Sequence, residues 1–124
     1  MIRVYRLNCG STGAEDIALA ETVRISKVLT WAVSPHEADV FVLTGPITRL
    51  TRPALLRIWQ DLIVGRRPLV ALGRSSIDGH PFGRGGIAEL PDVVSSAKLD
   101  GSAPALSAIQ SALIDAVRNY RRAH

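Results

Sequence analysis

The fold class of this chain rests on one segment, Ala38-Asp39-Val40-Phe41-Val42-Leu43-Thr44-Gly45-Pro46. Its centre is an apolar run, and a Gly-Pro pair closes it, which is typical of a β-strand. The apolar residues follow one another without alternating with polar ones. A strand of that kind is usually buried on both faces, so the segment predicts a sheet that is covered by helices on its two sides.

Similar patterns on either side of this segment predict four more strands and three helices. The strands are expected at Ile2–Leu7, Val28–Val33, Arg67–Gly73 and, on a weaker pattern, Asp92–Ala97. Apolar residues recur at helical spacing over Ala14–Arg24, Thr51–Val64 and Pro104–Arg122. This order of elements predicts a three-layer α/β/α fold with a mostly parallel sheet.

The size and composition of the chain indicate one domain. With 124 residues, 47% hydrophobic and 21% charged, we expect a single domain over residues 1–124. No apolar run approaches the roughly 18 residues that span a bilayer, and the alternating start at Met1–Arg6 is unlike a signal peptide. These features predict a soluble, cytoplasmic protein.

The charge of the chain permits an acidic partner but does not require one. The formal net charge is +4, and the basic residues near the C-terminus are expected to end a helix. Because these residues match no recognised nucleic-acid-binding motif, we expect no nucleic-acid partner. The pair Arg66 and Arg67 is expected to lie in a solvated loop.

Few residues are candidates for metal binding. Cys9 is the only cysteine, which excludes an internal disulfide and a cysteine-rich metal framework. We interpret Cys9 as a small buried hydrophobe, with a redox-sensitive thiol as the alternative. His36 and His80 are far apart in the sequence and lack nearby companions, so no metal site is expected there.

Three loops are expected to follow the carboxyl ends of strands, where open α/β sheets collect their ligands. They are residues 8–16, 73–79 and 100–104, and we expect them to converge. The glycine-rich segment Arg74–Pro91 is unusually long for a loop and therefore a functional candidate.

Motifs in and between these loops resemble a known family, the small subunit of NADH:quinone oxidoreductase (respiratory complex I) and of membrane-bound nickel-iron hydrogenases. The family's Gly-Ser-Cys-x-Gly-Cys-Asp-Ile aligns with Gly10–Ile17, and its Gly-x-Cys-Ala aligns with Gly73–Ser76. Its Ser-Pro-x-x-Ala-Asp-Val is present at Ser34–Val40, and its Thr-Gly-Pro-x-Thr at Thr44–Thr48. Its closing Gly-Cys-Pro-Pro aligns with Gly101–Pro104.

The resemblance implies a flavodoxin-like small-subunit fold and a four-iron, four-sulfur cluster, but the cluster's ligands are missing. The four cysteine positions of the family fall on Thr12, Glu15, Ser75 and Ser102. Hydroxyl and carboxylate oxygens are poor substitutes for thiolates as iron ligands. We therefore expect no cluster and no other cofactor, and we interpret the four positions as a vestigial site.

These four residues also have ordinary structural roles available. Thr12 and Ser102 are placed to cap helices, and the negative charge of Glu15 suits the start of a helix. With the cluster gone, we expect Thr12, Ser75 and Ser102 to hydrogen-bond the loop backbone, and Glu15 to face solvent or pair with Arg74. No catalytic residue is predicted.

The resemblance therefore implies a cluster-free structural or regulatory subunit. Its implied partner is a large subunit like that of complex I or nickel-iron hydrogenase, in a complex that is peripheral to a membrane. Independent enzymatic activity is not expected, although the family's class is oxidoreductase. The alternative is a flavodoxin-like domain or oxidoreductase whose emptied site binds a flavin, a nucleotide or an anion.

Overall fold

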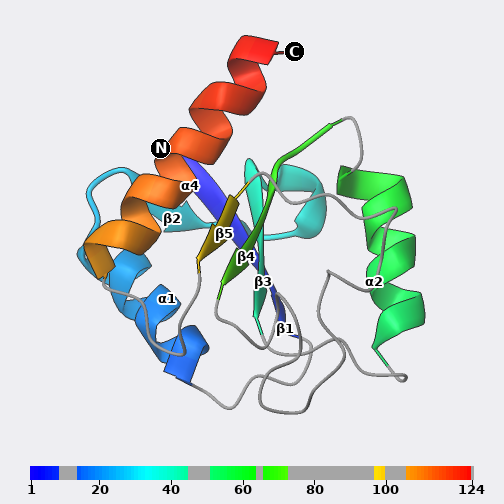
Figure 1. The fold of residues 1–124 in the computed structure, drawn as a ribbon, viewed down its shortest axis with the longest axis horizontal. Coiled ribbons are helices and arrows are strands. Elements are labelled where there is room, and N and C mark those ends of the chain that lie inside the picture. The colour runs from blue at the N-terminus through cyan, green and yellow to red at the C-terminus, as the bar shows by residue number, and fades with distance from the viewer. Residues whose placement is uncertain (9–13, 45–50, 64–65, 73–96, 100–105, 124) are drawn as a thin grey trace.

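The structure, a computed structural model, describes residues 1–8, 14–44, 51–63, 66–72, 97–99 and 106–123. Five parallel strands form one sheet in the order β2-β1-β3-β4-β5 (Figure 1). The strands are β1 (Ile2–Asn8), β2 (Leu29–Trp31), β3 (Val40–Thr44), β4 (Leu69–Leu72) and β5 (Ala97–Leu99). This order is that of flavodoxin-like folds, so the α/β fold class is confirmed.

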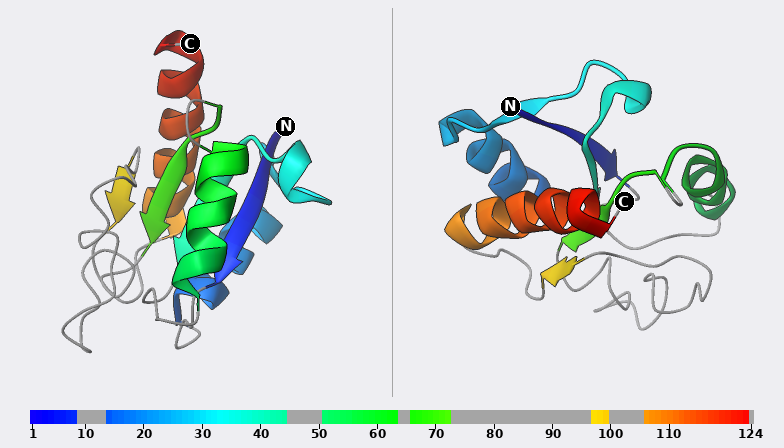
Figure 2. Two further views of the ribbon diagram at one scale, coloured as in Figure 1. Left: turned by 90° about the vertical axis from the view of Figure 1, so that its right-hand side faces the viewer. Right: turned by 90° about the horizontal axis from the view of Figure 1, so that it is seen from above.

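Helices cover both faces of the sheet (Figure 2). The helical elements are α1 (Ala14–Ile25), the short 3-10 helix η1 (Pro35–Glu37), α2 (Arg52–Ile58), the π-helical turn η2 (Trp59–Ile63) and α4 (Leu106–Ala123). Helices α1 and α4 pack on one face, and α2 with η2 packs on the other. The described elements thus form three layers, as the sequence predicted.

The central strand β3 shows why an unbroken apolar run is needed here. Successive side chains of a strand point to opposite faces. Val40 and Val42 pack with α1 and α4, whereas Phe41 and Leu43 pack with α2 and η2. All four side chains are fully buried. A polar residue at any of them would lie in one of the two cores.

The helices bury residues three or four positions apart. In α4 the buried positions include Ile109, Leu113 and Val117, which face the core on the α1 side of the sheet. Across α2 and η2 the buried residues are Leu55, Trp59 and Ile63. The spacing of four places these three residues on one side of the element. Trp59 is only 9% exposed, so it belongs to the core.

Most element boundaries differ from the predicted ones by one or more residues, and two of the differences have a structural cause. The helix predicted at Thr51–Val64 changes to π-helical geometry at Trp59, a change that the apolar spacing does not reveal. The strand predicted at Asp92–Ala97 was wrong at its C-terminal end, because β5 continues through Leu99. Its extent follows the pairing with β4, in which Leu99 is opposite Leu72. Residues 92–96 lie outside the described part of the chain.

Within the described residues, the structure has no helix that is both long enough and apolar enough to cross a membrane.

Candidate functional site

The carboxyl ends of four strands lie level with one another at one edge of the sheet. Asn8 is paired with Thr44, Thr44 with Leu72, and Leu72 with Leu99. The segments that follow these strands therefore start from a single edge, which we call the carboxyl edge. In flavodoxin-like sheets this edge, next to the point where the strand order reverses, is where ligands bind.

The predicted vestigial site falls mostly outside the described residues. Thr12, Ser75 and Ser102 are outside them, as are Cys9 and His80. Glu15 lies in the first turn of α1, but its side chain is outside what the structure describes. The strands that lead into the three loops, β1, β4 and β5, thus end at one edge of the sheet, with β3 between β1 and β4. The convergence of the loops, and the contacts expected of these side chains and of Arg74, stay predictions.

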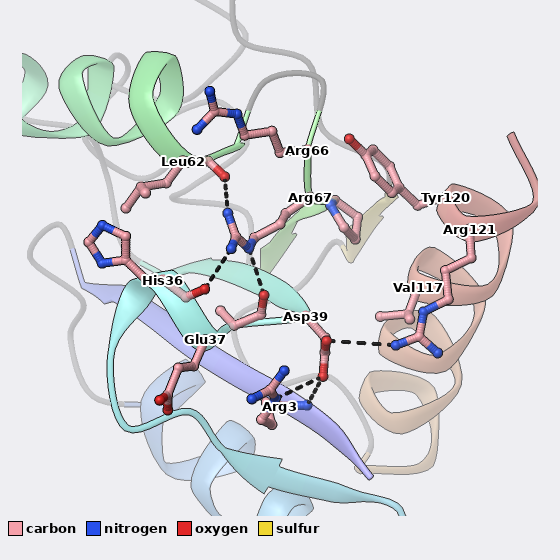
Figure 3. A pocket seen from close by; sticks show the side chains of 12 residues that line it. Arg3, His36, Glu37, Asp39, Leu62, Arg66, Arg67, Val117, Tyr120 and Arg121 are labelled. Atoms are coloured by element: carbon pink, nitrogen blue, oxygen red, sulfur yellow. Dashed lines mark hydrogen bonds and ion pairs between the residues drawn. The ribbon is translucent and has the colours of Figure 1, made fainter. Parts of the chain in front are cut away.

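A pocket lies at the opposite, amino edge of the sheet (Figure 3). It has a volume of about 590 Å³ and is open to solvent. Its walls come from the start of β1, from η1 and the two residues between η1 and β3, from the end of η2 with the segment after it, and from the end of α4. We call it the amino-edge pocket. It brings together segments from nearly the whole length of the chain.

The side chain of Arg67 hydrogen-bonds to backbone carbonyls of η1, of η2 and of the residue after η1. Its Nε donates to the carbonyl oxygen of Ala38 at 2.7 Å, its Nη1 to that of Leu62 at 2.8 Å, and its Nη2 to that of His36 at 2.6 Å. Figure 3 shows the guanidinium group between the three oxygens. The backbone N–H of Arg67 also donates to the carbonyl of Ile63, at the end of η2. Arg67 is therefore a structural tie between η2 and η1, including Ala38, the residue that caps the C-terminus of η1.

Asp39 ties β1 and α4 to the same place. Its Oδ2 accepts from the backbone N–H of Arg3 at 2.8 Å and lies 3.4 Å from Nε of that residue. Its Oδ1 lies 3.6 Å from Nη2 of Arg121. The Asp39 side chain is only 18% exposed, whereas the Arg121 side chain is 66% exposed. The pair with Arg121 is therefore well screened by water and weak.

Tyr120 closes the α4 side of the pocket. Burial raises the pKa of Tyr120 above its ordinary value, and the positive charge of Arg67 opposes that shift without cancelling it. The phenol is therefore neutral at physiological pH. Val117, one turn earlier on the same helix, adds an apolar surface.

Sequence reasoning missed this pocket and did not anticipate the contacts of one of its members. Arg66 and Arg67 were both expected in a solvated loop, and only Arg66 is exposed. Arg67 is partly buried by its three carbonyl contacts, which join residues up to 31 positions apart. No local pattern marks such a contact. The sequence does place Arg67 two residues before the buried strand β4, where a cation can reach carbonyls of neighbouring segments.

The histidine in the described part of the chain makes a backbone contact. His36 is exposed, and its carbonyl oxygen accepts from Arg67. Within the described residues, no three His, Cys, Asp or Glu side chains are close enough to hold a metal ion.

Comparison with known proteins gives similarity over part of the chain, and no family model matches it. Over 52 residues, 42% of the chain, it is 33% identical to the NADH-quinone oxidoreductase B subunit of Carboxydothermus hydrogenoformans. Over 49 residues it is 39% identical to the F(420)H(2) dehydrogenase B subunit of Methanosarcina mazei. The matched segments cover 31% and 26% of those relatives, so the chain matches less than a third of each. It is thus similar, over that part, to B subunits of multi-subunit oxidoreductases.

Proposed function

We propose that this protein is a cluster-free structural or regulatory subunit of an oxidoreductase complex. In this proposal its carboxyl edge docks against a large subunit like that of complex I or nickel-iron hydrogenase. The protein contributes a folded surface and carries no electrons. Association with a membrane, where it occurs, is through the complex.

The similarity to the B subunits of two oxidoreductases is the observation that carries this proposal. The structure supports it in a second way, because strands β1, β3, β4 and β5 end level at the carboxyl edge. A level edge offers one continuous surface to a partner. In the sequence, Thr12 precedes α1, Glu15 lies in its first turn, Ser75 follows β4, and Ser102 precedes α4.

Affinity purification from the native host, followed by mass spectrometry, tests the proposal. We expect a hydrogenase-like or complex I-like large subunit to be recovered in stoichiometric amounts. The variant Ser75→Arg, which adds bulk and charge three residues after the end of β4, should lose this partner. The matched control Glu37→Lys changes an exposed residue at the amino edge and should keep it. Recovery of the chain without such a large subunit would contradict the proposal.

The flavodoxin-like strand order favours a second candidate, a small-molecule binding domain. A flavin, a nucleotide or an anion would then bind at the carboxyl edge, beside the reversal of strand order between β1 and β3. The two candidates differ in a simple observation. Protein purified from its native host with a bound flavin is yellow, and a docking protein without a cofactor is colourless.

A further inference from the structure

We propose that the amino-edge pocket binds a small organic anion, a phosphate or carboxylate group attached to an apolar or aromatic body. This pocket lies at the edge of the sheet opposite the carboxyl edge, and the proposal does not depend on docking at the carboxyl edge. Three features of the pocket support the assignment: its charge, its remaining hydrogen-bond donors and its apolar walls.

The pocket has an excess of positive charge. The charged side chains that line it are those of Arg3, Arg66, Arg67, Arg121, Glu37 and Asp39. Asp39 is shared between two of the arginines. Among the described residues, the side chain of Arg67 donates to carbonyl oxygens, and so does that of Arg66, whose Nη1 donates to the carbonyl of Asp61 at 2.7 Å. Carbonyl dipoles satisfy donors but leave the net charge in place, so an anion is attracted to this pocket.

Arg67 also keeps donors for a ligand. A guanidinium group has five N–H bonds, and the three contacts to Ala38, Leu62 and His36 use one on each nitrogen. Among the described residues, the remaining N–H bonds on Nη1 and Nη2 have no acceptor. The three carbonyl contacts hold the group in one orientation. A donor that is fixed in advance loses little conformational entropy when a ligand binds.

The other walls suit the body of a small molecule rather than a bare ion. Leu62 lines one side, and Val117 and Tyr120, both on α4, line the other (Figure 3). A volume of about 590 Å³ is within the usual range for small-molecule sites. An anionic group near the arginines and an apolar body between Leu62 and Tyr120 fit these surroundings together.

Titration of the full chain with four probes, followed by NMR chemical shifts, tests the proposal. The probes are phenyl phosphate, benzoate, inorganic phosphate and uncharged benzamide, each up to about 10 mM. We expect saturable shifts at Arg67, Tyr120 and Val117 with one or both aromatic anions, and weaker binding at higher salt. The tighter of the two anions identifies phosphate or carboxylate as the preferred group.

Matched variants locate the binding. Arg66→Gln and Arg121→Gln should each weaken binding of the preferred anion about threefold or more, as expected for one partly exposed charge contact. Arg118→Gln removes the same charge from an exposed position of α4 outside the pocket and should bind like the unchanged protein. Melting temperatures of all three confirm that each variant is folded.

Four results would overturn the proposal. The first is the absence of saturable binding by both aromatic anions. The second is binding of benzamide as tight as that of benzoate, which would show that charge is not recognised. The third is inorganic phosphate binding as tightly as phenyl phosphate, which would show that the apolar walls take no part. The fourth is unchanged affinity in both pocket variants.

Discussion

Two adjacent arginines, Arg66 and Arg67, have different roles because their side chains meet different surroundings. Arg66 is exposed and makes one contact to a carbonyl oxygen. Arg67 contacts three carbonyls, two of them in partly buried surroundings. Buried carbonyls that lose their donor are costly, since water does not easily replace it. The two residues therefore differ in what they contribute to stability.

Arg67→Met should lower the free energy of unfolding by about 2 to 3 kcal/mol, because three carbonyls lose a charged donor. Arg67→Lys keeps the charge but not the planar set of donors, so it should recover only part of that loss. The control Arg66→Met should cost less than about 1 kcal/mol. Urea unfolding followed by tryptophan fluorescence measures all three. Equal losses at both positions would show that Arg67 is not a structural tie.

Tyr120 should make stability sensitive to alkaline pH. Because burial raises the pKa of Tyr120 in the folded state, the folded protein holds this proton more tightly than the unfolded chain does. The contribution of Tyr120 to the free energy of unfolding is complete below the ordinary tyrosine pKa of about 10. It is lost as the pH rises through the raised pKa that Tyr120 has in the folded protein. In Tyr120→Phe, the fall in unfolding free energy above about pH 10 should be smaller. Urea unfolding across that range measures it, and an unchanged fall would contradict the assignment.

At the scale of elements, α4 is the best example of a segment that sequence alone predicts. Its predicted range, Pro104–Arg122, differs little from the observed Leu106–Ala123. A long amphipathic periodicity predicts both that a segment is helical and which of its faces is buried. Strand β5 is the opposite case, because a three-residue edge strand has no periodicity of its own and its extent is set by β4. The π-helical turn likewise has no sequence pattern.

Leu113 lies at the centre of the buried face of α4 and is fully buried. Leu113→Ala should lower the free energy of unfolding by about 3 kcal/mol, because it removes apolar contacts and leaves a cavity. Ser111→Ala, on the exposed side of the same helix, should change it by less than about 0.5 kcal/mol. Thermal and urea unfolding of both variants provide the measurement. A small effect at Leu113 would mean that α4 does not pack as described.

At the scale of the whole molecule, the sequence predicted the carboxyl edge and missed the amino-edge pocket. Strand ends and glycine-rich loops are visible in a sequence, so the candidate edge could be located from them. The pocket needs Arg3, Asp39, Arg67 and Arg121 to meet, and no spacing connects residues of four separate segments. Such a site follows from the packing of α4 and η2 against the sheet, which only the structure shows.

The four positions where the resembling family has cluster cysteines are Thr12, Glu15, Ser75 and Ser102 in this chain. We therefore predict that the protein carries no iron-sulfur cluster. Protein purified under anaerobic conditions should contain far less than one iron per chain and show no charge-transfer absorption in the visible range. The quadruple cysteine variant, treated in parallel with iron and sulfide, is the matched comparison. Reconstitution of the unchanged chain to about four irons, with a paramagnetic signal on reduction, would refute the prediction.

The parallel sheet also has a consequence for how the chain folds. Every pairing between neighbouring strands joins distant parts of the sequence, as in Ile2 with Leu29, Phe41 with Leu69 and Val70 with Ala97. Long loops must close before any such contact forms, and chains with non-local contacts fold in milliseconds to seconds rather than microseconds. During synthesis, β1 can be paired on both sides only after β3 has left the ribosome. The exposed strand edges in that interval are where a nascent chain of this kind is most open to aggregation.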